Sequence, residues 1–186
     1  MRIIAGEFGG RRLKAPTGRN TRPTPDRVRE ALFLILAEEI PDARVVELFG
    51  GTGSLGLESL SRGAAHAVFL EKNRGALACL TANIETLDVG DRTTVHTRSA
   101  FSFPALAAHG DPFDLVFCDP PFRLFDESSG RRRLEDLLTS LPIHPGGLAI
   151  IEHRAGHLAD FAPGGFALRE VRKWGATGMA IYRRSS

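Results

Sequence analysis

Short apolar runs alternate with amphipathic segments along the middle of this 186-residue chain. Parallel strands need a long crossover, and a helix is its usual form, so the alternation predicts a parallel sheet covered by helices. Only a short connection through Trp174 and Gly175 separates the last two runs, which requires a hairpin and an antiparallel final strand. This α/β pattern places seven strands near residues 44–49, 66–71, 93–98, 113–119, 147–152, 166–172 and 177–183, and helices near 54–62, 73–87, 101–108 and 130–140.

The first forty residues show a different pattern. Residues 2–5 and 11–15 flank a glycine-rich turn, which predicts a small β-hairpin, and residues 16–21 have the character of a linker. Thr24 is expected to cap a helix with Pro25 at its first position. The apolar side chains then recur at helical spacing until Pro41: Val28, Leu32, Ile35, Leu36 and Ile40. We therefore divide the chain into a basic hairpin arm with its linker, residues 1–21, and a sheet domain, residues 22–186.

The most informative motif is Asp119-Pro120-Pro121-Phe122, which follows the apolar run 113–118. Open α/β sheets bind their ligands at the carboxyl ends of the strands. Two prolines make a stiff turn that presents the Asp119 carboxylate and free carbonyl oxygens, while Phe122 offers a stacking face. Such acceptors suit an exocyclic amine on a planar base, although an ordinary Asp-Pro turn after a strand would look similar.

The chemistry of an aryl amine gives these residues roles. Its lone pair is delocalised into the ring, so the nitrogen is a poor nucleophile. Asp119 and the Pro120 carbonyl could accept the two N–H bonds and draw the nitrogen towards tetrahedral geometry. Pro121 stiffens the turn, and Phe122 stacks on a base that has left its helix. The motif therefore predicts methylation of an amino group, with Asp119, Pro120, Pro121 and Phe122 as the catalytic set.

A second site follows the strand near 44–49. The loop from Phe49 through Gly50, Gly51 and Gly53 opens a helix, and its glycines allow close approach of a ligand. Glu71 ends the next strand, where an acid can accept from two ribose hydroxyls. The loop also fits the dinucleotide fingerprint, so an NAD-dependent oxidoreductase is an alternative. Glu47 favours S-adenosylmethionine, because it would repel a pyrophosphate but could receive a methionine ammonium.

Together these motifs resemble class I methyltransferases that act on exocyclic amines, and more narrowly the bacterial family that methylates N2 of a guanine in 16S ribosomal RNA (the guanine-966 type). The resemblance extends to residues 2–6, 10–13, 22–33, 53–58 and 173–177. It implies a Rossmann-like fold and S-adenosylmethionine as cofactor, with Lys72, Ala100 and Phe101 joining the cofactor residues above and Asp119 among them. Three residues depart from the family pattern, which has Asp at Glu47 and at Asn73, and Asn at Leu34.

Charge is unevenly distributed along the chain. Residues 1–29 hold eight of the 24 Lys and Arg residues against two acids, a net +6, whereas the remaining 16 cations face 20 acids, a net −4. A basic arm on a near-neutral body indicates phosphate contact, and arginine suits bidentate phosphate binding and base stacking. A solvated charge run is the alternative, as it is for Arg131 to Arg133, which Glu135 and Asp136 can neutralise. The predicted RNA-binding residues are Arg2, Arg11, Arg12, Lys14, Arg22, Arg27 and Arg123.

The remaining composition limits the function classes. The start of the chain is unlike a signal peptide and no stretch is apolar enough for a bilayer, so we expect a cytoplasmic protein, acting as a monomer on 16S ribosomal RNA. Cys79 and Cys118 are expected to be reduced core residues, and His153 and His157 lack the partners of a metal site. DNA adenine N6, protein or small-molecule amine methylation, and non-catalytic RNA binding stay open as alternatives.

Overall fold

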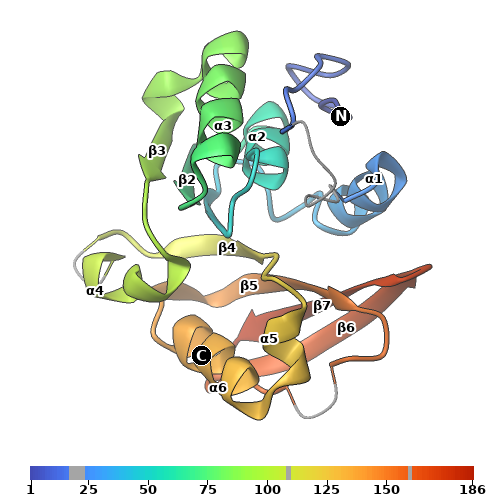
Figure 1. The fold of residues 1–186 in the computed structure, drawn as a ribbon, viewed down its shortest axis with the longest axis vertical. Helices are drawn as coiled ribbons and strands as arrows, with labels where there is room; N and C mark the ends of the chain where they lie inside the picture. The colour runs from blue at the N-terminus through green and yellow to red at the C-terminus, as the bar shows by residue number, and fades with distance from the viewer. Residues whose placement is uncertain (17–23, 108–109, 159–160) are drawn as a thin grey trace.

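The computed structural model describes residues 1–16, 24–107, 110–158 and 161–186, which contain a seven-stranded sheet flanked by helices (Figure 1). The strand order is β3-β2-β1-β4-β5-β7-β6, and β7 runs antiparallel to both of its neighbours. The predicted mostly parallel sheet with an antiparallel last strand is confirmed. The strands are β1 (Arg44–Leu48), β2 (His66–Leu70), β3 (Thr93–His96), β4 (Phe113–Cys118), β5 (Ile143–Arg154), β6 (Phe166–Trp174) and β7 (Thr177–Arg184).

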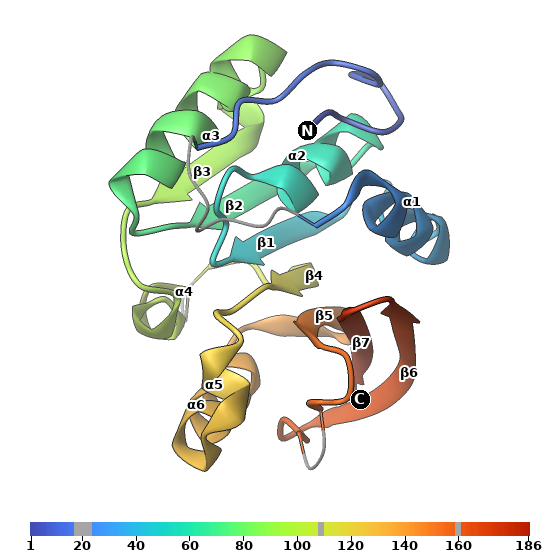
Figure 2. The same ribbon diagram turned by 45° about the vertical axis from the view of Figure 1, so that its right-hand side comes forward.

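Helices cover both faces of the sheet. Figures 1 and 2 show α1 (Asp26–Ile35), α2 (Ser54–Ser61) and α3 (Arg74–Leu87) on one side of it. The other side carries α4 (Pro104–Ala107), α5 (Arg123–Asp126) and α6 (Ser128–Thr139). Two single-turn 3-10 helices, η1 (Gly90–Arg92) and η2 (Ala100–Ser102), flank β3 in the chain.

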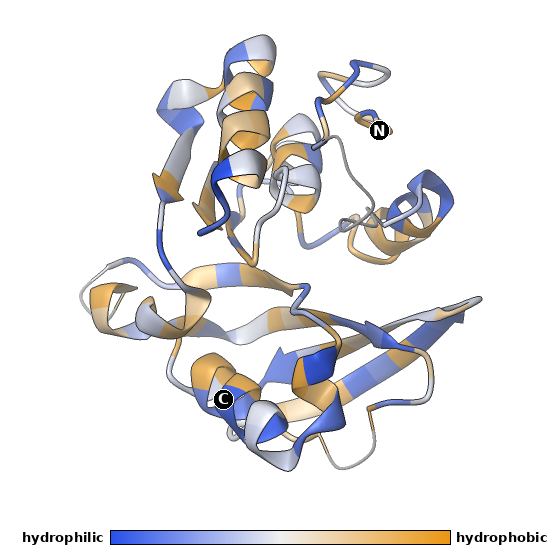
Figure 3. Cartoon of the chain, viewed as in Figure 1, coloured by the Kyte–Doolittle hydropathy of each residue, from blue (hydrophilic) through white to orange (hydrophobic). Residues whose placement is uncertain are grey.

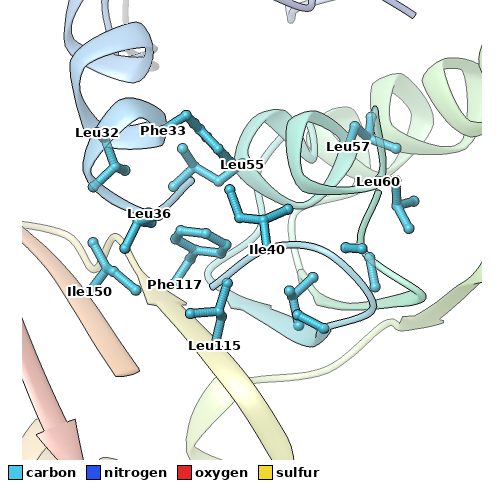
Figure 4. Packing of buried hydrophobic residues seen from close by; sticks show 14 of the residues in the cluster. Leu32, Phe33, Leu36, Ile40, Leu55, Leu57, Leu60, Leu115, Phe117 and Ile150 are labelled. Atoms are coloured by element: carbon cyan, nitrogen blue, oxygen red, sulfur yellow. The ribbon is translucent and has the colours of Figure 1, made fainter. Parts of the chain in front are cut away.

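Strand alternation divides the core into two clusters. Along β4, Leu115 and Phe117 pack with α1 and α2, whereas Val116 and Cys118 pack on the side of α6. Figure 4 shows Phe117 among leucines of α1 and α2, and Figure 3 shows the apolar stripes that these helices turn towards the sheet. A strand buried on both faces has this continuous apolar character because neither of its faces meets water.

The N-terminal segment, residues 1–16, packs against the body. Ile3, Phe8 and Leu13 are buried in the same cluster as α1 and α2. The carboxylate of Glu58 on α2 is fully buried and accepts from the backbone N–H groups of Ile4 and Ala5, at 2.7 and 3.1 Å. The boundary placed between residues 21 and 22 lies outside the described residues.

Several local predictions need correction. The N-terminal hairpin is present but shorter than expected, with one antiparallel bridge between Arg2 and Arg12 and backbone bonds from the Ile3 and Leu13 N–H groups to the Arg11 and Met1 carbonyls. Pro25, not Thr24, is the N-cap of α1, because the Thr24 hydroxyl donates to Glu152 at 2.7 Å instead of closing the helix. The predicted helix to residue 40 ends at Ile35, and turns at residues 36–39 carry the last apolar side chains into the core.

The other differences concern the lengths of elements. The single helix expected near 101–108 consists of η2 and α4, and α5 was not anticipated. The strand expected near 147–152 is longer, since β5 extends over Ile143–Arg154. In the described ranges, no helix combines the length and apolar character needed to cross a bilayer.

Candidate active site

A cavity of about 640 Å³ lies at the carboxyl ends of β1, β2 and β4, the edge of the sheet where α/β folds bind ligands. Its walls come from the loops that follow these strands and from the segment after β3. The end of the N-terminal segment, Ala15 and Pro16, also reaches it. The further lining residues are Thr24, Glu47, 49–52, Ser54, Leu55, 70–73, Ala76, 98–101, 119–124 and Arg133.

The glycine loop between β1 and α2 depends on its lack of side chains. Gly53 adopts a φ of +79°, and a Cβ there would lie 2.4 Å from Leu80 Cδ1. A Cβ on Gly56 would lie 2.4 Å from the ring of Phe69 and 3.1 Å from Glu47 Oε2. Even Phe49 has a positive φ, of 59°, which a residue with a side chain adopts only when its surroundings demand it. The loop is therefore held close to β2 and α3 while its outer edge lines the cavity.

Glu71 joins the end of β2 to this loop. One carboxylate oxygen accepts from the Gly51 N–H at 2.8 Å, and the other accepts from the Lys72 and Asn73 N–H groups at 2.7 Å each. Asn73 then caps α3 by accepting from Gly75 and Ala76. Each carboxylate oxygen has two acceptor positions, so the held carboxylate keeps capacity for a ligand hydroxyl.

Glu47 lies beneath the start of α2. Its carboxylate accepts from the Gly56 and Leu55 N–H groups, at 2.8 and 3.3 Å. Burial raises the pKa of Glu47 from 4.5 to about 7, although these two hydrogen bonds and the charge of Arg29 oppose the change. The group can therefore change charge near neutral pH, which makes it responsive to a cation placed in the cavity.

Asp119 has a second carboxylate beside it. Cys118 of β4 pairs with Ile151 of β5, so Asp119 and Glu152 leave the two adjacent strands side by side and on the same face. Burial first, and then the charges of Glu152 and Glu47, raise the pKa of Asp119 well above its usual value. Glu47, Asp119 and Glu152 therefore lie close together near the carboxyl ends of β1, β4 and β5.

The turn after Asp119 leads directly into α5. The Phe122 ring is half-buried at the cavity wall, and the exposed Arg154 guanidinium lies 5.9 Å from its centroid. The Pro121 and Phe122 carbonyls accept from Leu124 and Phe125, at 2.9 Å each, and so close the first turn of the helix. This short helix keeps Phe122 at the cavity rather than in the core.

Aromatic and cationic groups form another wall of the cavity. Phe49 and Phe101 make an edge-to-face pair with centroids 5.7 Å apart, and the Arg133 guanidinium lies 4.3 Å from the Phe101 ring. Planar groups of this kind suit a flat heterocycle. Arg133 comes from α6, which the sequence places far from the loop after β3.

The whole chain matches known proteins. The family model described as Conserved hypothetical protein 95 matches residues 1–183. Ribosomal RNA small subunit methyltransferase D of Escherichia coli (strain K12) is 36% identical over 190 residues, covering 100% of this chain and 91% of that protein. Among solved structures, Escherichia coli yhhF is similar with a TM-score of 0.83 at 37% identity, covering 100% of this chain and 98% of that one. A Thermus thermophilus protein gives 0.79 at 31% identity, covering 97% and 98%.

The chain belongs to the ribosomal RNA small subunit methyltransferase D family. The family and fold class predicted from the motifs are confirmed. Every predicted catalytic and cofactor residue lines the one cavity except Gly53, which packs behind the loop against Leu80.

The predicted RNA-binding residues are more scattered. Arg123 lines the cavity, whereas Arg2 pairs with Asp26 at 3.5 Å and Arg11 lies over the Phe8 ring at 5.4 Å. Lys14 is exposed at its side chain, but its backbone is bonded to Asn83 on α3. Arg12 and Arg27 are exposed, and Arg22 lies outside the described residues.

Sequence reasoning missed three residues in or beside this cavity: Thr24, Arg133 and the Thr24 partner Glu152. Glu152 ends the strand that the sequence predicts near 147–152, so the strand-end rule that found Glu47 and Glu71 could also have found it. Thr24 was assigned to a helix cap, and Arg133 to a solvated charge run. No local signal marks Arg133, because its position depends on how α6 packs. Across the described ranges no His, Cys, Asp or Glu side chains gather into a group that could hold a metal ion.

Proposed function

We propose that this protein transfers a methyl group from S-adenosylmethionine to the exocyclic N2 amine of a guanine in 16S ribosomal RNA. The observation that carries the proposal is the single cavity in which the glycine loop, Glu71 and the Asp119 turn meet. The name of its Escherichia coli relative, ribosomal RNA small subunit methyltransferase D, supports the substrate class.

The residues of the cavity fit this methyl donor. S-adenosylmethionine supplies an electrophilic methyl group on a sulfonium and carries an ammonium on its methionine part. Glu47 is placed to receive the ammonium, and Glu71 to accept from a ribose hydroxyl while it holds Gly51. Phe101, on which the Arg133 guanidinium stacks at 4.3 Å, offers a planar surface to the adenine at the cavity wall.

The target amine would meet the turn after β4. Asp119 and the Pro120 carbonyl accept its two N–H bonds, which frees the lone pair for in-line attack, and Phe122 stacks on the flipped base. A methylated aryl amine must lose a proton. The raised pKa of Asp119 makes its ionised carboxylate, facing the cationic donor, a stronger base and therefore a suitable first acceptor of this proton. Positioning of the two reactants supplies much of the remaining rate enhancement.

The test is methyl transfer from isotope-labelled S-adenosylmethionine to unmethylated 16S ribosomal RNA, both free and assembled in small subunits, followed by nucleoside analysis. We expect N2-methylguanosine as the product. A single N6-methyladenine product on DNA would instead establish the amine chemistry with another base. Calorimetry with S-adenosylmethionine and NAD separates the two readings of the glycine loop, since tighter binding of NAD would overturn the proposal.

A further inference from the structure

Trp174 forms part of a second, smaller cavity that the proposed chemistry leaves unused. This open groove has a volume of about 340 Å³. It lies between Pro25, Arg27 and Val28 at the start of α1 and Trp174 and Gly175 at the turn between β6 and β7. Val28 is buried, whereas Pro25, Arg27 and Gly175 are exposed and Trp174 is partly so. The indole therefore presents a free part of its surface in an open groove.

The sheet register places this groove next to the candidate active site. Thr177 of β7 pairs with both Arg154 of β5 and Trp174 of β6, so these three side chains share one face. Glu152 lies on the same face two residues before Arg154, and it bonds Thr24 on the wall of the larger cavity. Two strand spacings, roughly 10 Å, separate Arg154 from Trp174. Figures 1 and 2 show the tip of this hairpin close to α1.

Aromatic and cationic side chains alternate along this path. Phe122 lies at the larger cavity, Arg154 lies 5.9 Å from its ring centroid, and Arg27 and Trp174 line the groove. A strip of exposed cations between two aromatic rings matches the alternation of phosphates and bases in a single strand. Its charge suits a polyanion and does not favour an apolar protein segment.

We propose that Trp174 stacks on an unpaired base of the ribosomal RNA next to the target nucleotide, while Arg154 and Arg27 contact the connecting phosphates. This inference rests on the proposed function, because it takes the flipped guanine to lie at Phe122. Arg154 lies 5.9 Å from the Phe122 centroid and roughly 10 Å from Trp174 across two strand spacings, so the strand that enters the larger cavity passes Arg154 before it reaches Trp174. The second base would hold the strand in register, so the groove would act on RNA affinity and not on methyl transfer itself.

Trp174 is the one tryptophan of the 186 residues, so its fluorescence reports directly on the groove. Unmethylated 16S ribosomal RNA should change its emission and shield it from acrylamide quenching. Base stacking contributes about 1–3 kcal/mol, so W174L should raise the KM for RNA roughly 5- to 150-fold with kcat and S-adenosylmethionine affinity unchanged. W174F retains a stacking ring and should stay close to the parent.

L168A serves as the matched control, since Leu168 is an exposed apolar residue on the same strand. If W174L does not fold, the fluorescence change of the parent on RNA binding and the KM of W174F for RNA still test whether Trp174 stacks on a base. A parent that methylates the RNA without any change in emission or quenching overturns this inference alone. So does a folded W174L with the parent KM. A parent that binds S-adenosylmethionine but neither binds nor methylates the RNA overturns the proposed function as well.

Discussion

At the scale of single residues, the site is governed by carboxylates removed from water. Glu47 of β1, Asp119 directly after β4 and Glu152 of β5 lie on one face of three neighbouring strands; Glu47 and Glu152 are buried and Asp119 is partly buried. Burial disfavours ionisation and raises the pKa values of Glu47 and Asp119, and neighbouring carboxylates add to the rise, Glu71 at Glu47 and Glu152 with Glu47 at Asp119. A cationic ligand reverses that penalty, so the site is electrostatically suited to a donor with positive charge.

Asp119 gives the first prediction. D119A removes both acceptor oxygens and should lower the single-turnover rate about 10²- to 10³-fold, with S-adenosylmethionine affinity largely unchanged. D119N should lose less, because an amide oxygen still accepts one N–H bond in a side chain of the same shape. Rapid-quench measurement at saturating RNA and donor checks both rates. Full activity in D119A would remove Asp119 from the mechanism.

Glu47 gives a prediction about pH. Its pKa is higher in the folded protein, about 7, than the ordinary 4.5, so folding binds a proton more tightly. Stability from this group is therefore fully present below about pH 4.5 and falls as pH rises to about 7, by up to about 3 kcal/mol. Asp119 acts in the same direction, and Arg29 and Glu71 modify the effect at Glu47.

Urea unfolding of the ligand-free protein between pH 4.5 and 8 measures this dependence. E47Q cannot titrate at this position, so its free energy of unfolding should fall less over the same range. Equal slopes for parent and E47Q would show that Glu47 does not titrate in this window.

At the scale of elements, buried polar side chains tie the N-terminal segment to the cofactor loop. Asn83 of α3 accepts from the Lys14 N–H at 2.7 Å and donates to the Lys14 and Thr52 carbonyls at 3.1 Å each. One amide thus links the basic segment, the glycine loop and a helix. Nearer the N-terminus, the Glu58 carboxylate and the Ser61 hydroxyl of α2 accept from the Ile4 and Phe8 N–H groups of the same segment.

N83A should leave buried backbone groups without partners, and we expect it to destabilise the protein by roughly 2–3 kcal/mol. It should also weaken S-adenosylmethionine binding, because the Thr52 carbonyl is released. T86A on the same helix is the control, since Thr86 is exposed and should change stability by less than about 0.5 kcal/mol. Denaturant unfolding and calorimetry measure the two effects. An N83A variant as stable as T86A would contradict this link.

At the scale of the whole molecule, charge and chemistry occupy neighbouring regions. Residues 1–29 carry a net +6 against −4 for the remainder, and the segment 1–16 ends at the cavity wall with Ala15 and Pro16. A bound polyanion would therefore meet the basic segment and the cavity together. Other arginines, including Arg183 and Arg184, lie where β7 ends, at the opposite edge of the sheet.

Replacing Arg11, Arg12 and Lys14 together by Gln should weaken RNA binding uniformly across sequences. Each lost phosphate contact should reduce the slope of log K against log salt by about 0.7–0.9. Exchanging Arg169, Arg183 and Arg184 for Gln removes equal charge elsewhere and should leave the slope nearly unchanged. Salt titrations of all three proteins provide the measurement. A slope equal to that of the parent in the first variant would mean that the segment is a solvated charge run.

The order of strands and helices followed from local patterns, since apolar period and turn residues act over a few positions. The strand-end acids Glu47, Glu71 and Asp119 were found in the same way, because carboxyl ends of parallel strands share one edge. Thr24 was misassigned, since a helix cap and a bond to Glu152 look alike in the sequence.

Only the tertiary structure brought together residues from distant segments. Arg133 reaches Phe101 through the packing of α6, and Trp174 meets Arg27 where a hairpin tip lies close to α1. The N-terminal segment was expected to be a separate arm, yet Ile3 and Phe8 lie in the core. The physical reason is that such contacts depend on the summed burial of many side chains. That free energy is not carried by any local stretch of the chain.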